Sequence, residues 1–206
     1  TSGLTINDLN KYLPALQTVD DIIMNADSMK EGIFWTEGLK GLKKIPEKSI
    51  DLIITEPPKE PWINLDDRGE QLTLQEFYDW NYEWLLEANR VLKNTGGIYL
   101  LCDWSRSNMY NGLLNEKFII QNRITWYNRL AKNNNQNLTW KNQSGDIWFA
   151  TKNEDFLFNN NATSLKSERR LLLNDRERKA QTNFWFDIPA ATNKTARYSN
   201  KLYSKI

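Results

Sequence analysis

The sequence predicts an α/β fold in which a mostly parallel central sheet is flanked by helices. Two short apolar runs, 51–55 and 98–102, are rich in Ile and Leu and end at polar residues, as buried strands do. Between them lies a long segment, 74–92, with apolar residues at helical spacing. A strand, a helix and a strand in this order make a parallel crossover the expected connection. The chain has 206 residues, enough for one such domain.

The composition excludes several kinds of chemistry. The chain has no histidine, which removes histidine-based acid–base catalysis, catalytic triads and histidine metal sites. Cys102 is the single cysteine, so neither an internal disulfide nor a cysteine-rich zinc site is expected. Neither a signal peptide nor a long apolar run is recognisable, and we expect a cytoplasmic protein without a membrane segment. The net charge of +1 predicts no strong overall electrostatic steering.

The first strong strand ends at an acid and two prolines. Its β-branched apolar residues are followed by Glu56, Pro57 and Pro58. Proline has no N–H group to give to a sheet, so the strand must end at Thr55 or Glu56. The carboxylate of Glu56 then lies at the carboxyl end of a strand, where open α/β sheets bind their ligands.

The segment before this strand is less regular. Residues 21–28 are expected to form a short strand that ends at Asp27, and residues 29–49 a helix and a loop. A helix N-cap is the ordinary structural role for Asp27.

The long helix has clear start and stop signals. Thr73 and Glu76 have the spacing of a capping box, and Lys93 with Gly96 and Gly97 is typical of a helix end. A buried strand that ends at Asp103 is predicted next. Beyond it we expect a helix at 105–117, one long or two short strands within 118–127, and a strand at 146–151.

Several segments in order resemble a known family. They are the strand with Glu-Pro-Pro (49–58), the helix-to-strand segment (84–99), and the stretches 122–126 and 140–151. Together they resemble the S-adenosylmethionine-dependent DNA amino-methyltransferases that act on adenine N6 or cytosine N4, in the permuted class whose catalytic half comes first. The resemblance implies a single Rossmann-like methyltransferase domain over 1–206, with a catalytic half at 21–160 and a basic segment at 161–206.

The family pattern assigns catalytic roles around the double proline. An acid or amide and the first proline's carbonyl hold the amino group of the target base, and an aromatic residue stacks on that base. The resemblance therefore implies a catalytic set of Glu56, Pro57, Pro58, Lys59 and Trp62. Glu56 is one carbon longer than the usual aspartate, and Lys59 stands where the family has its aromatic residue. Trp62 is the candidate replacement for that ring, although tryptophans more often pack in cores.

The resemblance also implies S-adenosylmethionine as the cofactor. The residues that match cofactor positions are Asp27, Ser28, Thr55, Glu56 and Asp103. The family's Phe-x-Gly-x-Gly loop does not occur in the sequence, whose last glycine is Gly145. We therefore expect a fold that is incomplete on its C-terminal side, either because the chain is a fragment or because a partner completes it.

The expected macromolecular partner is double-stranded DNA with one base flipped out. Arg129, Lys132, Trp140 and Lys141 lie in a loop rich in asparagine and are the candidate DNA contacts, although a polar surface loop is the simpler interpretation. From residue 166 on, ten Lys and Arg face four acids, a surplus that suits phosphate contacts or a solvated helix face.

Three functions stay open at this point. The acid before the prolines favours adenine N6 over cytosine N4 as the target. The alternative is a catalytically degenerate, nucleic-acid-binding partner subunit of a methyltransferase complex, because Lys59 and the absent glycine loop depart from the family. A purely structural α/β domain fits the ordered set of matches least. A homodimer or a heterodimer is compatible with the many aromatic residues.

Overall fold

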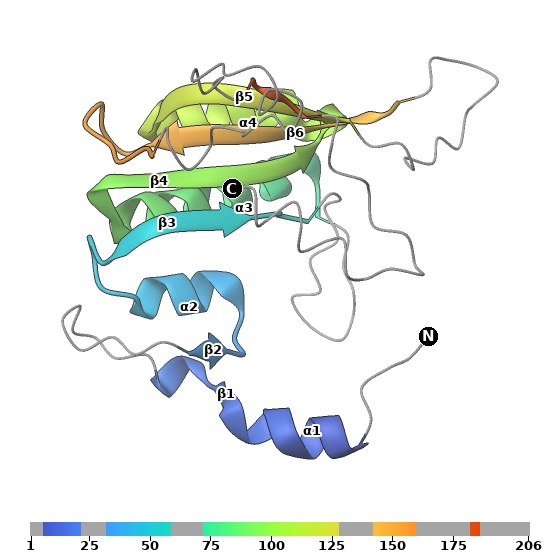
Figure 1. Cartoon of the computed structure of the whole chain (residues 1–206), viewed down its shortest axis with the longest axis vertical. Coiled ribbons are helices and arrows are strands. Elements are labelled where there is room, and N and C mark those ends of the chain that lie inside the picture. The colour runs from blue at the N-terminus through green and yellow to red at the C-terminus, as the bar shows by residue number, and fades with distance from the viewer. Residues whose placement is uncertain (1–5, 22–31, 59–71, 128–141, 160–181, 186–206) are drawn as a thin grey trace, which may run out of the picture.

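The computed structural model describes residues 6–21, 32–58, 72–127, 142–159 and 182–185, and all structural statements refer to these. A five-stranded sheet with the order β3-β4-β6-β5-β7 is the main element (Figure 1). The strands are β3 (Ile50–Thr55), β4 (Leu92–Asp103), β5 (Ile119–Tyr127), β6 (Ser144–Thr151) and β7 (Phe184–Trp185). The larger helices are α2 (Gly38–Lys44), α3 (Leu74–Val91) and α4 (Trp104–Lys117).

The strand directions confirm the predicted fold class. β3 and β4 are parallel, and so are β5 and β7, whereas β6 lies between β4 and β5 and is antiparallel to both. Within the described sheet, β6 is thus the strand that runs against the others. The predicted strands at 51–55, 98–102 and 146–151 and the predicted helix at 105–117 are all present.

A smaller unit precedes the sheet. It contains α1 (Ile6–Tyr12), two 3-10 turns, η1 (Leu13–Ala15) and η2 (Val19–Asp21), and the parallel strands β1 (Leu16–Gln17) and β2 (Ile33–Phe34). Of the strand predicted at 21–28, Asp21 lies in η2, and the rest lies outside the described residues. None of the described helices has the length and apolar character needed to cross a membrane.

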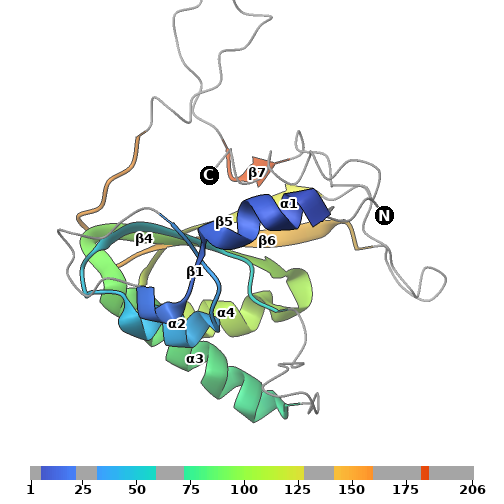
Figure 2. The same cartoon turned by 90° about the horizontal axis from the view of Figure 1, so that it is seen from below.

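Helices α3 and α4 cover one face of the sheet, as Figure 2 shows. The core on that face is built from α3, α4, β4 and β6, and it includes Leu85, Leu100, Leu113 and Trp148. The opposite face carries a second apolar cluster that includes Tyr99, Ile147, Phe149 and Trp185. Alternate residues of β4 and β6 therefore point into the two clusters, as the period of two along a strand requires.

The helix stop predicted at Lys93 and Gly96–Gly97 is wrong. Helix α3 ends at Val91, and Lys93, Gly96 and Gly97 already belong to β4. A Cβ atom on Gly96 would lie 3.0 Å from the carbonyl oxygen of Asp51 and 3.0 Å from Leu92 Cδ2. Close approach of neighbouring backbone, rather than a helix end, therefore accounts for glycine at this position.

The prediction that the first strand is buried is also wrong. Leu52 and Ile54 of β3 expose 44% and 38% of their surface, while Ile53 packs against the core. The reason is the place of β3 at one end of the described sheet, where it is covered less completely than β4.

A buried amide connects α3 to α4. The side chain of Asn81 is 0% exposed. Its Nδ2 atom donates to the Phe77 carbonyl at 2.7 Å, and its Oδ1 atom accepts from Trp84 Nε1 at 3.0 Å and from the Tyr110 hydroxyl at 2.9 Å. The burial of both aromatic donors therefore depends on one acceptor atom.

We expect Asn81→Leu to lower the free energy of unfolding by about 2–4 kcal/mol, because two buried donors lose their acceptor. Urea denaturation followed by circular dichroism measures this change. Tyr110→Phe removes one donor and leaves Oδ1 paired with Trp84, and its cost should be nearer 1 kcal/mol. An Asn81→Leu variant as stable as Tyr110→Phe would contradict this role.

A lysine closes the carboxyl end of α3. Lys152 Nζ lies 2.7 Å from the Asn89 carbonyl oxygen and 2.8 Å from that of Leu92. These carbonyls have no further helical turn to accept from, so an ammonium group there satisfies them and interacts favourably with the helix dipole. Burial is the main cause that lowers the pKa of Lys152, and the charge of Lys48 adds to it.

We expect Lys152→Met to destabilise the protein by about 1.5–3 kcal/mol, the value of hydrogen bonds to a charged donor. The matched control is Lys93→Met, which removes an ion pair with Asp51 whose side chains are 43% and 69% exposed and should change stability by less than about 1 kcal/mol. Thermal unfolding of both variants compares them, and equal destabilisation would argue against the helix-capping role.

Candidate functional site at the carboxyl edge of the sheet

The double proline ends β3 as predicted. Thr55 is the last residue of the strand and pairs with Leu100. Glu56 follows and is exposed, Pro57 is buried, and Pro58 is exposed. Because the prolines cannot extend the ladder, the Glu56 carboxylate lies at the sheet edge, accessible to solvent. The expectation of an accessible acid at the carboxyl end of this strand is met.

β4 continues past this point and brings Asp103 to the same edge. Thr55 is opposite Leu100, while β4 runs on to Asp103, which is opposite Gly145 of β6. Asp103 is the N-cap of α4, and its Oδ1 atom accepts from the backbone N–H of Ser105 at 3.3 Å. The structure therefore gives Asp103 a helix-capping role, and its contact with a cofactor stays a prediction.

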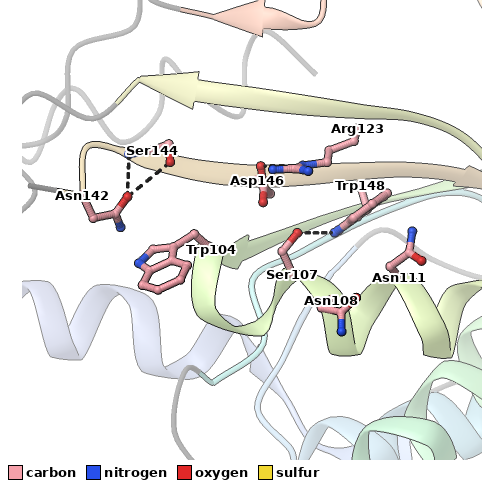
Figure 3. Close-up of a pocket in the computed structure, with 9 residues that line it drawn as sticks. All are labelled: Trp104, Ser107, Asn108, Asn111, Arg123, Asn142, Ser144, Asp146 and Trp148. Atoms are coloured by element: carbon pink, nitrogen blue, oxygen red, sulfur yellow. Dashed lines mark hydrogen bonds and ion pairs between the residues drawn. The ribbon is translucent and has the colours of Figure 1, made fainter. Parts of the chain in front are cut away.

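Next to this edge a pocket of about 500 Å³ opens between α4 and the strands β5 and β6 (Figure 3). At its base Asp146 is 2% exposed, and its Oδ1 atom accepts from Arg123 Nε at 2.9 Å. The other oxygen, Oδ2, is buried and has no hydrogen-bond partner. The lining residues are Trp104, Ser107, Asn108, Asn111, Arg123, Asn142, Ser144, Asp146 and Trp148.

Neighbouring contacts hold the pocket walls in place. Trp148 Nε1 donates to Ser107 Oγ at 3.1 Å, which ties β6 to α4. The guanidinium of Arg123 lies 5.9 Å from the centre of the Trp148 ring, within the range of a cation–π contact. Ser144 donates its backbone N–H to Asn142 Oδ1 at 3.2 Å. Side chains from three elements are thereby held around Asp146.

The one cysteine is not poised as a nucleophile. Burial, with a further contribution from the charge of Asp146, raises the pKa of Cys102 to about 12. Its thiol therefore stays protonated at neutral pH, and the reactive thiolate is scarce. Covalent catalysis by Cys102 is not supported by this environment.

The structure brings together some of the predicted site residues. Thr55, Glu56 and Asp103 share the carboxyl edge of the sheet, but neither Glu56 nor Pro57 lines the pocket. No group of three or more potential metal ligands occurs among the described residues. The remaining predicted residues lie outside the described part: Asp27, Ser28, Lys59, Trp62, Arg129, Lys132, Trp140 and Lys141.

Sequence reasoning missed the pair of Arg123 and Asp146. The available signal was an aspartate directly before the buried run Ile147–Thr151, a place where an acid needs a partner. The partner could not be read from the sequence because Arg123 comes from β5, which pairs with β6.

Comparisons with known proteins agree with the expected family. Residues 50–205, more than half of the chain, match the N6/N4 methylase family, described as "DNA methylase". The chain is 34% identical over 90 residues to the DNA adenine methyltransferase YhdJ of Escherichia coli K12, and 31% identical over 101 residues to the type II methyltransferase M.HpaI of Haemophilus parainfluenzae. These matches cover 44% and 48% of the chain but only 31% and 32% of the two relatives.

Solved structures show the same fold. The PvuII DNA methyltransferase, named as cytosine-N4-specific, aligns with a TM-score of 0.57 at 18% identity, over 92% of this chain and 65% of that one. TTHA0409, a DNA modification methylase of Thermus thermophilus, aligns with a TM-score of 0.55 at 17% identity, over 82% and 70%. The fold, the position of Glu-Pro-Pro at the end of β3 and the family match together lead to one conclusion: the chain belongs to the N6/N4 DNA methylase family.

Proposed function

We propose that this chain carries the catalytic half of a DNA methyltransferase that moves a methyl group from S-adenosylmethionine to an exocyclic amino group of DNA. The observation that carries the proposal is the exposed Glu56 at the carboxyl end of β3, followed directly by Pro57 and Pro58. In a member of the N6/N4 DNA methylase family, a hydrogen-bond acceptor at this edge is suited to hold the amino group of a base.

The donor and acceptor groups at the edge fit parts of the proposed cofactor. Thr55 offers a hydroxyl, and Glu56 and Asp103 offer carboxylate oxygens, all at the carboxyl edge of the sheet. Carboxylates there suit the ammonium and ribose hydroxyl groups of a nucleoside cofactor. A TTHA0409 structure complexed with S-adenosyl-L-methionine also has this fold, with a TM-score of 0.51.

The proposed role of Glu56 is to activate a poor nucleophile. The lone pair of an exocyclic amino nitrogen is delocalised into the ring of the base. The Glu56 carboxylate and the Pro57 carbonyl oxygen accept hydrogen bonds from the two N–H groups and so localise the lone pair on nitrogen. When bound, S-adenosylmethionine supplies an electrophilic methyl group on a sulfonium. Most of the rate then comes from positioning and electrostatics rather than from a covalent enzyme intermediate.

The proposed substrate is duplex DNA with the target base flipped out of the helix, since the amino group is not reachable for in-line attack within the stack. Arg129, Lys132, Trp140 and Lys141 remain the candidate DNA contacts, with Trp62 as the candidate stacking ring in place of an aromatic at Lys59. A cytoplasmic location and a dimeric state also stay predictions.

We expect the modified base to be N6-methyladenine. An acid before the prolines favours adenine, and the relative at 34% identity is named a DNA adenine methyltransferase. The measurement is mass spectrometry of nucleosides after digestion of duplex DNA that has been incubated with the protein and S-adenosylmethionine. N4-methylcytosine as the product would reverse the base assignment and leave the reaction type intact.

We expect Glu56→Ala to lower methyl transfer by at least about 100-fold, because a preorganised acceptor for the reacting group is lost. DNA affinity should change little, since the carboxylate makes no favourable contact with phosphates. Transfer of a labelled methyl group to duplex DNA and a parallel DNA-binding titration measure the two effects. Glu56→Asp keeps a carboxylate of the usual family length and should retain transfer.

The matched control is Glu154→Ala, an exposed glutamate that follows the far end of β6. It should leave both transfer and DNA binding unchanged. Undiminished transfer in Glu56→Ala would remove Glu56 from the mechanism. DNA binding by the wild-type protein without cofactor binding or transfer would favour the alternative, a nucleic-acid-binding partner subunit.

A further inference from the structure

The pocket beside α4 contains a buried carboxylate oxygen that the described protein leaves unsatisfied. Asp146 is 2% exposed, and its Oδ1 atom is paired with Arg123 Nε. Its Oδ2 atom is buried without a hydrogen-bond partner. Figure 3 shows Asp146 projecting between β6 and α4, with one oxygen on Arg123 and the other turned away from it. Because buried acceptors are almost always paired, Oδ2 calls for a donor from a ligand.

The charges around this oxygen define the class of ligand. Asp146 and Arg123 compensate each other, so the pocket is formally neutral. A phosphate would meet the buried carboxylate, and a simple cation would meet the guanidinium, so neither is favoured. The other polar walls are hydroxyls and amides, including Ser107, Asn108 and Asn142, which can both donate and accept. This set fits a neutral ligand that has an N–H donor beside acceptor atoms.

The shape of the site adds a preference for a flat ligand. Trp104, the first residue of α4, lines the pocket and is 57% exposed, so its ring is available at the rim (Figure 3). Exposed aromatic rings stack on nucleobases whatever their sequence. The volume of about 500 Å³ is within the range of small-molecule sites.

We propose that this pocket is a second nucleobase site, in which Asp146 Oδ2 accepts a hydrogen bond from an exocyclic amino group and Trp104 stacks on the ring. It is separate from the proposed transfer site, because Glu56 and Pro57 do not line it. The base comes either from an unpaired nucleotide of a DNA strand or from a free nucleoside. Only the first source rests on the proposed function.

The test compares adenosine with purine riboside, which lacks the amino group, by isothermal titration calorimetry with the whole protein. We expect adenosine to bind about tenfold more tightly, the effect of one hydrogen bond to a charged acceptor. Asp146→Asn should remove this preference. Trp104→Ala should weaken both ligands about tenfold, while the control Trp35→Ala, at a tryptophan that is 78% exposed and outside the pocket, should change neither.

A further pair of measurements separates this site from the transfer site. Glu56→Ala should keep the adenosine preference although it loses methyl transfer, so failure of the proposed transfer reaction leaves this test intact. Competition by a single-stranded oligonucleotide would identify a DNA base as the ligand, and lack of competition would identify a free nucleoside. Equal binding of adenosine and purine riboside, no nucleoside binding at millimolar concentration, or a preference lost in Glu56→Ala and kept in Asp146→Asn would overturn the proposal.

Discussion

The hydrogen-bond ladder on both sides of β4 is the interaction on which the described structure depends. β4 pairs with β3 in parallel and with β6 in antiparallel register, and Ile98 and Leu100 at its centre are fully buried. Since β3 ends at Thr55 while β4 continues to Asp103, the ladder produces a staggered edge. The proposed transfer site at Glu56 and the second pocket both lie along that edge.

Two local devices terminate elements at this edge and leave polar groups there. The prolines after Glu56 cannot donate to the ladder, so the acid stays outside the sheet. Asp103 ends β4 and caps α4 through the Ser105 N–H, which starts the helix whose first turn carries Trp104 and Ser107. An acid at a strand end thus serves here as a proposed ligand contact and there as a helix cap.

The two buried polar side chains between sheet and helices differ in a way that separates structure from function. Asn81 has partners for both its amide atoms, and it binds α3 to α4. Asp146 has a partner for one oxygen only. A satisfied polar group rigidifies a core, whereas an unsatisfied one destabilises it until a ligand supplies the missing bond. The retention of Asp146 in the pocket is accounted for by binding better than by stability.

The sequence by itself determined the features that depend on near neighbours: the strand end at Thr55, because proline lacks an N–H group, and the start of α3 at Thr73 and Glu76, because a capping box is formed within four residues. The tertiary structure alone decided the rest. The conversion of Leu92–Gly97 from helix end to strand, the exposure of Leu52 and the meeting of Arg123 with Asp146 all depend on strand pairing between distant segments. Pairing energy arises only when those segments meet, so no local pattern along the chain could encode these contacts.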